Sequence, residues 1–129
     1  MLIRYKKNQE KIAMGLLSFM PVEKKDIKLL QQTIQAYHSN PNWHLYLWKE
    51  ADDIVGAIGL RIADELNVVV QHISVNPSYR NMGIGNKMVA AIKRQYGDKY
   101  DVCPDDFTQE FFEKCSEKEN TEAKDEQDE

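Results

Sequence analysis

Alternation of apolar and polar residues predicts five β-strands in this chain. Successive side chains of a strand point to opposite faces, so a strand with one buried face has a period of two. The predicted strands are residues 2–6, 43–50, 54–62, 66–75 and 99–103, and the first three show this alternation. In the fourth segment, Val68, Val69 and Val70 follow one another without a polar break. That run indicates a central strand with both faces covered.

Apolar residues three and four positions apart predict four helices, at residues 9–20, 23–38, 83–96 and 107–115. Asn8 is a suitable N-cap for the first helix, and Pro21 ends it. Gly97 ends the third. We expect one apolar stripe of each of the first three helices to face the core. The stripes are Ile12, Leu16 and Phe19; Ile27, Leu30, Ile34 and Tyr37; and Ile84, Met88, Ile92 and Tyr96.

The order of these elements is β-α-α-β-β-β-α-β-α, which predicts an α+β domain with a mixed sheet over residues 1–115. A helix between the fourth and fifth strands lets them run parallel, whereas short turns make neighbours antiparallel. The length of 129 residues suits one domain with one core. No apolar run approaches the ~20 residues that span a bilayer. The N-terminus is too short and too mixed for a signal peptide, so we expect a cytoplasmic protein and no membrane partner.

Charge is unevenly distributed along the chain. The net charge is −4, yet residues 116–129 alone contain seven acidic residues and two lysines. This segment has no aromatic and no β-branched apolar residue, so we expect a disordered acidic tail. The rest of the chain is nearly neutral, which argues against nucleic acid as a partner.

The cysteines and histidines form no recognised disulfide or metal pattern. Cys103 and Cys115 are too few for a disulfide framework, and we expect both to be reduced. His38, His44 and His72 lack the spacing of a metal site. The sequence therefore predicts no bound metal.

A loop with two glycines follows the fourth strand and is the strongest candidate for a binding site. The strand stops at Asn76-Pro77, and Arg80-x-x-Gly83-x-Gly85 then opens the third helix. The first amides of a helix have no intrahelical partner, and the helix dipole adds partial positive charge there. Glycines let an anion approach the backbone closely. The alternative interpretation is an ordinary turn whose glycines serve packing.

Two other nucleotide-binding motifs do not fit this loop. A dinucleotide-binding loop needs a third glycine, but position 88 is a methionine, and the preceding strands form a meander instead of a βαβ unit. A P-loop needs Gly-Lys-Ser/Thr, which this loop lacks.

The strand, the proline turn, Arg-x-x-Gly-x-Gly and the amphipathic helix together resemble the acetyl-CoA-binding motif of the GNAT superfamily of N-acetyltransferases. The predicted elements of residues 2–115 are similar to the GNAT fold as well. Residues 11–21 and 71–78 resemble the small acetyltransferase-like proteins of bacterial riboflavin-biosynthesis operons. Family members usually add two C-terminal strands, for which residues 116–129 are too polar. The fifth strand would then be an exposed edge, and a homodimer that covers it is a hypothesis.

The resemblance implies acetyl-CoA or CoA as co-substrate, held along the fourth strand and the loop. Pantetheine would pair with backbone groups of Ile73 and Val75, and loop amides would surround the pyrophosphate. Arg80 would contact a phosphate or brace the loop, and Lys87 would reach the 3′-phosphate or adenine side or remain a surface lysine. The full set of cofactor-binding candidates is Ile73, Val75, Arg80, Met82, Gly83, Ile84, Gly85, Asn86 and Lys87.

The catalytic groups of the family are only partly matched. The family commonly takes an acid for the leaving thiolate from a tyrosine in the last helix, but Phe112 stands at that position. Many members also have a carboxylate on the fourth strand, where this chain has a run of valines. His72 and Tyr79 are the catalytic candidates in their place; the alternatives are a core histidine and a surface tyrosine. Four further residues remain open: Tyr37, His38, His44 and Tyr46.

Two functions therefore follow from the resemblance. The first is an acetyl-CoA-dependent N-acetyltransferase that acts directly on an amine of a small molecule or protein, with a link to riboflavin biosynthesis. The second is a CoA-binding regulatory or interaction module with little or no turnover. The apolar segment 18–22 is either core packing or one wall of an acceptor pocket.

Overall fold

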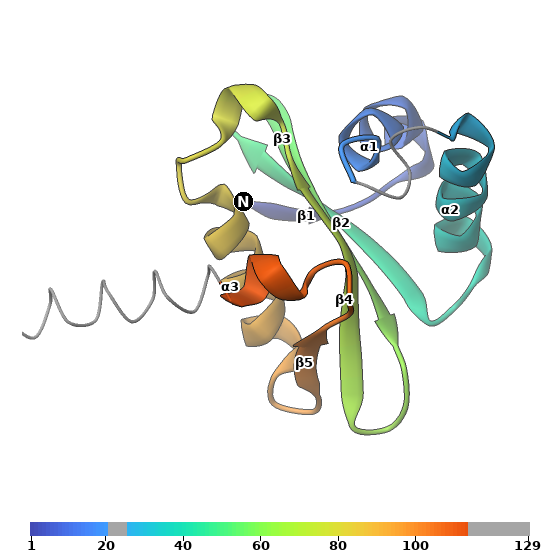
Figure 1. The fold of residues 1–129 in the computed structure, drawn as a ribbon, viewed down its shortest axis with the longest axis vertical. Coiled ribbons are helices and arrows are strands. Elements are labelled where there is room, and N and C mark those ends of the chain that lie inside the picture. The colour runs from blue at the N-terminus through green and yellow to red at the C-terminus, as the bar shows by residue number, and fades with distance from the viewer. Residues whose placement is uncertain (21–25, 114–129) are drawn as a thin grey trace, which may run out of the picture.

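The computed structural model describes residues 1–20 and 26–113. Its centre is a five-stranded sheet with the order β1-β2-β3-β4-β5 (Figure 1). The strands are β1 (Leu2–Arg4), β2 (Trp43–Glu50), β3 (Asp53–Ile62), β4 (Asn67–Val75) and β5 (Asp101–Pro104). β4 and β5 run parallel, and the other neighbours are antiparallel. The predicted mixed sheet and the α+β class are confirmed.

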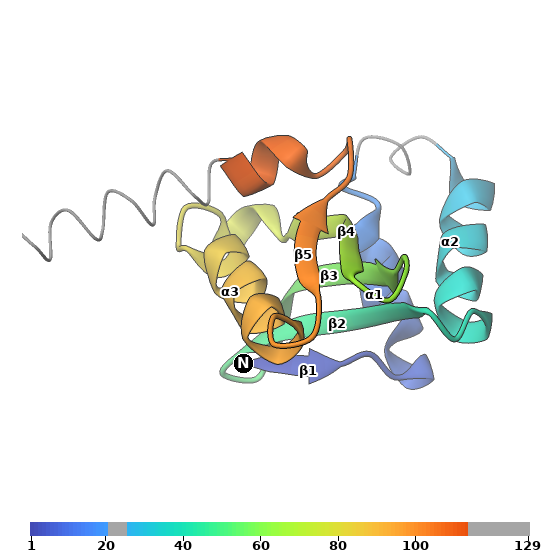
Figure 2. The ribbon, with the colours of Figure 1, turned by 90° about the horizontal axis from the view of Figure 1, so that it is seen from below.

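Helices cover both faces of the sheet (Figure 1, Figure 2). One face carries α1 (Glu10–Leu17), which follows a 3₁₀ turn at Lys7–Gln9, and α2 (Ile27–Ser39). The opposite face carries α3 (Ile84–Tyr96) and the helical residues 109–113. Each helical layer encloses its own apolar cluster, one around Ile58 and Met88 and the other around Leu17 and Ile34. The sheet is thus the middle layer between two cores.

The buried stripe of α1 differs from the predicted one. Ala13, Leu16 and Leu17 are buried, whereas Ile12 is 48% exposed and Phe19 is 42% exposed. Apolar residues cover more than one face of this helix, so periodicity alone does not select the buried side. Contacts with α2, β3 and β4 select it instead. The predicted stripe of α3 is confirmed, with its first three positions buried.

The starts of α1 and α2 also differ from prediction. The Asp26 carboxylate caps α2 by accepting a hydrogen bond from the Leu29 amide at 3.1 Å. Ile27, the first residue of α2, is 72% exposed, while the other three predicted stripe positions are buried. The N-cap of α1 is Gln9, and Asn8 lies inside the preceding 3₁₀ turn.

A β-bulge at Gln71 divides β4 into two parts. Gly59 of β3 faces His72, but the next residue, Leu60, faces Val70, so Gln71 is the extra residue. β5 pairs with β4 only as far as Val70, which faces Pro104. The part of β4 beyond the bulge therefore extends past the end of β5.

The turn after β5 is fixed to the carbonyl group of Val70. This oxygen accepts hydrogen bonds from the Asp105 amide at 3.2 Å and from the Thr108 hydroxyl at 2.7 Å. Thr108 is completely buried. The two bonds satisfy the carbonyl group at which the pairing of β4 with β5 ends, and they lead the chain away from the sheet, where residues 109–113 form a helix.

Some sequence predictions concern residues outside the described ranges. Cys115, the end of the last predicted helix and the acidic tail lie within residues 114–129, and the first residues of the second predicted helix lie within 21–25. Cys103 is a free thiol on β5, and its partial burial raises its pKa. Among the described helices, none is long and apolar enough to cross a membrane.

Gly59 provides space for the side chain of Tyr37 against the middle of the sheet. A methyl group at Gly59 would overlap the hydroxyl and ring of Tyr37. Tyr37 itself is 8% exposed and packs against Trp43 and His72. The close approach of α2 to β3 thus requires glycine at this position.

Gly59→Ala is expected to lower the free energy of unfolding by about 1–3 kcal/mol, because the methyl group displaces Tyr37 from a packed site. Urea unfolding followed by circular dichroism measures the change. Gly15→Ala is the control: a methyl group there would meet no other side chain within 4 Å, and alanine favours the helix by about 0.5–1 kcal/mol. Equal stability of Gly59→Ala and the wild type would contradict this packing.

Candidate active site

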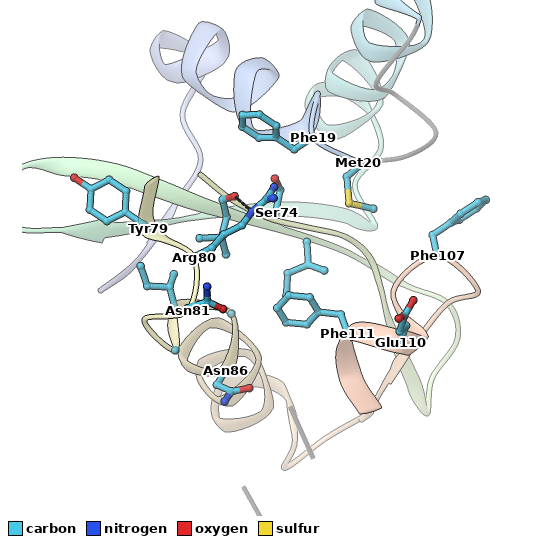
Figure 3. Close-up of a pocket in the computed structure, with 15 residues that line it drawn as sticks. Phe19, Met20, Ser74, Tyr79, Arg80, Asn81, Asn86, Phe107, Glu110 and Phe111 are labelled. Carbon is cyan, nitrogen blue, oxygen red and sulfur yellow. Dashed lines mark hydrogen bonds between the residues drawn. The ribbon is translucent and has the colours of Figure 1, made fainter. Parts of the chain in front are cut away.

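A cavity of about 530 Å³ lies where β4, the start of α3, the end of α1 and the helical residues 109–113 meet (Figure 3). We call it the main cavity. It is lined by Phe19, Met20, Ile73, Ser74, Val75, Tyr79, Arg80, Asn81, Gly83, Ile84, Gly85, Asn86, Phe107, Glu110 and Phe111. It therefore brings together most of the cofactor-binding residues that the sequence suggested.

The edge of β4 beyond the bulge forms one wall of the main cavity. The Asn76 amide donates to the Val55 carbonyl of β3 at 2.8 Å. Backbone groups alternate in direction along an antiparallel strand, so those of Ile73 and Val75 point away from β3. The Val75 carbonyl accepts a hydrogen bond from Arg80 Nε at 3.3 Å, which agrees with this direction. This edge is available to an extended ligand that adds to the sheet.

The start of α3 forms the facing wall. Asn81 and Gly83 both have a left-handed backbone, with φ of 66° and 75°, and Gly83 is the N-cap of the helix. The helical hydrogen-bond ladder begins with the Lys87 amide, which donates to the Gly83 carbonyl at 3.0 Å. The amides of Ile84 and Gly85 precede this ladder and have no intrahelical partner. Together with the helix dipole they favour an anion.

Gly85 is required for a different reason from Gly83. A methyl group at Gly85 would overlap the ring of Phe111, whereas nothing lies within 4 Å of one at Gly83. Gly83 instead satisfies the left-handed backbone. The two glycines of the sequence motif therefore have separate roles, one in conformation and one in packing.

Arg80 braces the loop from inside the cavity wall. Its Nε donates to Val75, and its guanidinium carbon lies 5.7 Å from the centre of the Phe19 ring. These contacts connect the loop to β4 and to the end of α1. The guanidinium still lines the main cavity (Figure 3), so bracing does not remove it from reach of a bound anion.

Two of the suggested cofactor residues do not line the main cavity. Met82 is 59% exposed. The ammonium of Lys87, a side chain that is 55% exposed, lies 3.8 Å from a carboxylate oxygen of the half-buried Glu50 at the β2–β3 turn. The remaining seven candidates line the cavity.

The two catalytic candidates lie in different places. The Tyr79 ring lines the main cavity, but its hydroxyl donates to the Asp53 carboxylate at 3.0 Å. That hydrogen bond, and the charge of Asp53, raise the pKa of Tyr79. In Figure 3 the hydroxyl points away from Phe111 and Glu110. His72 is 8% exposed, and its Nδ1 lies 2.6 Å from the Tyr37 hydroxyl on the opposite side of the bulge.

Phe111, rather than Phe112, lies in the main cavity. Phe112 is 8% exposed within the core beneath α3, where the Lys93 ammonium lies 5.8 Å from its ring centre. The helical residues 109–113 thus present Phe111 and Glu110 to the cavity. The resemblance places Phe112 at the family's tyrosine position, but the ring that lines the cavity is that of its neighbour Phe111. Two adjacent phenylalanines in the sequence indicate that one aromatic ring of this helix is near the site, but they do not show which ring lines the cavity and which lies in the core.

Ser74 and Glu110 line the main cavity, and the sequence did not single them out. The Ser74 hydroxyl is buried and donates to the Leu16 carbonyl at 2.6 Å, which fixes the end of α1 against β4. This contact brings Phe19 and Met20 into the cavity wall. Of the segment 18–22, predicted as either core or pocket wall, residues 18–20 are described. Phe19 and Met20 line the cavity, and Met20, which is 5% exposed, also belongs to the core.

A second pocket of about 290 Å³ adjoins the main cavity. Met20 and Phe107 line both spaces, so these two side chains form the boundary between them. The second pocket lies beside the bulge, on the face of α2. Its remaining lining residues are Thr33, Trp43, Arg61, Gln71, His72 and Asp105.

These residues fit a CoA thioester in three respects. The free edge of β4 can pair with an extended amide chain, the start of α3 can hold an anion, and the cavity between them is continuous. Among the described residues, no three His, Cys, Asp or Glu side chains are grouped as metal ligands.

The sequence of residues 9–117 matches the Acetyltransferase (GNAT) family, and the chain belongs to this family. It is 55% identical over 115 residues to an uncharacterised N-acetyltransferase in the lysA 3′ region of Bacillus methanolicus. That match covers 89% of this chain and 94% of the relative. The predicted family is thus confirmed, and the narrower likeness to proteins of riboflavin operons stays a prediction.

Solved structures show the same fold. A GNAT family acetyltransferase from Elizabethkingia anophelis with acetyl-CoA bound aligns with a TM-score of 0.61 and 19% identity, over 79% of this chain and 63% of that one. An aminoglycoside acetyltransferase from an uncultured soil metagenomic sample, in complex with sisomicin, aligns with a TM-score of 0.66 and 16% identity, over 89% of this chain and 86% of that one. At these identities the likeness establishes the GNAT fold alone.

Gly85→Val is expected to weaken CoA binding at least tenfold, because the side chain displaces Phe111 and covers the start of α3. Isothermal titration calorimetry with CoA measures the affinity, and circular dichroism checks the fold. Gly15→Val is the matched control, since Gly15 lies on α1 with open space around it. Unchanged affinity in a folded Gly85→Val protein would show that CoA binds elsewhere.

Proposed function

We propose that this chain transfers the acetyl group of acetyl-CoA directly to the amine of a small-molecule or protein acceptor. The observation that supports this most is the shared cavity. The free edge of β4 and the amide-rich start of α3 face the same space of about 530 Å³. An acyl donor with an extended amide arm and a pyrophosphate matches both walls at once.

Each wall would have its own part in holding the donor. The backbone groups of Ile73 and Val75 would pair with the pantetheine arm, as an added strand does. The amides of Gly83, Ile84 and Gly85 would bind the pyrophosphate, and Arg80 would add positive charge beside it. Asn86 lines the cavity at the same end. Met82 and Lys87 do not line the cavity; contact of Lys87 with the 3′-phosphate or the adenine side stays a prediction.

The chemistry is acyl transfer from a thioester to a neutral amine. The amine nitrogen forms a bond to the acetyl carbon, the carbon–sulfur bond breaks, and the sulfur keeps that electron pair. The nitrogen loses a proton and the thiolate gains one, so charge and atoms balance. A backbone N–H at the β4 edge would stabilise the negative charge that develops on the carbonyl oxygen.

Glu110 is our candidate for the group that accepts the amine proton. It is the carboxylate among the lining residues of the main cavity, and it lies beside Phe107, at the boundary with the second pocket (Figure 3). Tyr79 is a weaker candidate because its hydroxyl donates to Asp53. Phe111 supplies an apolar surface and no proton, so the thiolate would leave without an acid from this ring.

Amine-dependent release of CoA tests the proposed function. We expect at least one primary amine, in a screen that includes flavin-pathway amines, to release free thiol from acetyl-CoA above background. Thiol detection with Ellman's reagent measures the rate, and mass spectrometry identifies the acetylated amine. The Gly85→Val variant is the control for site-dependent release. CoA binding without release for any amine would favour the alternative, a regulatory or interaction module.

Glu110→Gln is expected to lower kcat at least tenfold and to leave the Kd for CoA unchanged, because only the proton acceptor is removed. Steady-state kinetics and calorimetry measure the two quantities. Glu113→Gln is the control on the same helix, since Glu113 is exposed and does not line the cavity. If both changes lower kcat equally, or if neither lowers kcat, Glu110 is not the proton acceptor.

Two further predictions from the sequence remain open. A cytoplasmic location and a homodimer across the β5 edge are consistent with the proposed function but do not follow from it. Light scattering at micromolar concentration distinguishes a monomer from a dimer.

A further inference from the structure

The second pocket contains a guanidinium group that the fold holds in place. Arg61 lies on β3, and its Nη1 donates to the Gln71 side-chain oxygen at 3.1 Å. Gln71 is the bulge residue of β4 and is 6% exposed. The guanidinium can only donate hydrogen bonds, so the amide oxygen of Gln71 must face it and the amide nitrogen must face the other way.

The nitrogen side of Gln71 continues the same network. It donates to the Tyr37 hydroxyl at 3.0 Å, and that hydroxyl lies 2.6 Å from His72 Nδ1. Gln71, Tyr37 and His72 are each more than nine-tenths buried. A rotation of Arg61 would therefore cost hydrogen bonds among groups that water does not reach. The bulge, through this network, fixes where the guanidinium points.

Arg61 keeps unused hydrogen-bond donors in the pocket. Within residues 1–20 and 26–113, the structure gives it one hydrogen bond, to Gln71, and no ion pair. Asp105 lines the same pocket, but its Oδ1 accepts from the Phe107 and Thr108 amides. These hydrogen bonds hold the Asp105 carboxylate in the turn after β5. A partly buried guanidinium with four remaining N–H groups is suited to an anionic oxygen group.

We propose that the second pocket binds the acceptor, and that Arg61 binds an anionic oxygen group, a carboxylate or a phosphate, on that acceptor. This inference rests on the proposed function and names its substrate class. The amine would extend past Met20 and Phe107 into the main cavity, toward the thioester at the β4 edge. Trp43 and Phe107 would enclose the carbon chain between the two ends.

The strand geometry limits the length of such an acceptor. Gln71, which holds Arg61, and Ile73, at the donor edge, are two residues apart on β4, which corresponds to roughly 7 Å along a strand. A volume of about 290 Å³ also suits a small molecule. We therefore expect short aminocarboxylates or aminoalkyl phosphates to be better acceptors than long or uncharged amines.

Matched acceptor pairs test the proposal. The carboxylate series is glycine, β-alanine, 4-aminobutyrate and 6-aminohexanoate, and each is compared with its primary amide. O-phosphoethanolamine against ethanolamine gives the phosphate comparison. Thiol release from acetyl-CoA gives kcat/KM for each. In at least one of the two comparisons, carboxylate or phosphate, we expect kcat/KM for the anionic acceptor to exceed that for its neutral partner at least tenfold. The difference should come mainly from a lower KM.

Substitution of Arg61 shows whether this preference comes from the guanidinium. Arg61→Met is expected to reduce the ratio of anionic to neutral acceptor to about one, and Arg61→Lys to retain part of it. Arg94→Met, at an exposed position on α3, is the control and should keep the full ratio. CoA affinity should be unchanged in all three variants, which separates acceptor binding from donor binding and from misfolding.

The outcomes separate this inference from the proposed function. Turnover of amines without any preference for anionic ones, or a preference that survives Arg61→Met, overturns the role of Arg61 and leaves the proposed function intact. Absence of turnover counts against the proposed function. Binding of an anionic amine to the CoA-loaded protein then tests the role of Arg61. In ¹H–¹⁵N spectra of the CoA-loaded protein, 4-aminobutyrate or O-phosphoethanolamine must shift amides around Gln71 in the wild type and not in Arg61→Met; no shift overturns the proposal.

Discussion

The carbonyl group of Val70 is the point at which β4 and β5 separate, and the candidate site depends on that separation. Its oxygen accepts hydrogen bonds from the Asp105 amide and the buried Thr108 hydroxyl. The Val70 carbonyl therefore keeps hydrogen-bond partners at the point where the chain after β5 leaves the sheet. The next residue, Gln71, is the bulge that shifts the register against β3. Because β5 ends at this level, the backbone of Ile73 and Val75 faces a cavity rather than another strand.

Two spaces arise from this single irregularity, one on each side of the Met20–Phe107 boundary. The main cavity lies along the strand edge and the amide-rich start of α3, as an acyl donor requires. The second pocket lies against the bulge itself, where Gln71 connects Arg61 to a buried hydrogen-bond network. A bulge both bends a strand and redirects a side chain. Here one space lies along the β4 edge beyond the bulge, and the other lies beside the bulge residue itself.

Much of the fold could be predicted because its signals are local. The alternating strands, the order of elements and the Gly83–Gly85 helix start are all present in short stretches of sequence. The errors occurred where several local solutions were equally good. The apolar residues of α1 cover more than one face, so periodicity predicts an inward Ile12, which is 48% exposed in the structure. For the same reason the sequence could not distinguish Phe111, which lines the cavity, from the buried Phe112.

By itself, the sequence determined the class of the protein: a strand, a proline turn and a glycine-containing helix start define an anion site through the backbone, whatever the surrounding side chains. Tertiary structure alone decided which side chains surround that site. Glu110 and Arg61 are charged residues without a motif, and they reach the cavities only because the turn after β5 and the bulge in β4 place them there. The physical reason is that backbone conformation is encoded over a few residues, whereas contacts between β3, β4 and residues 105–111 join segments far apart in the chain.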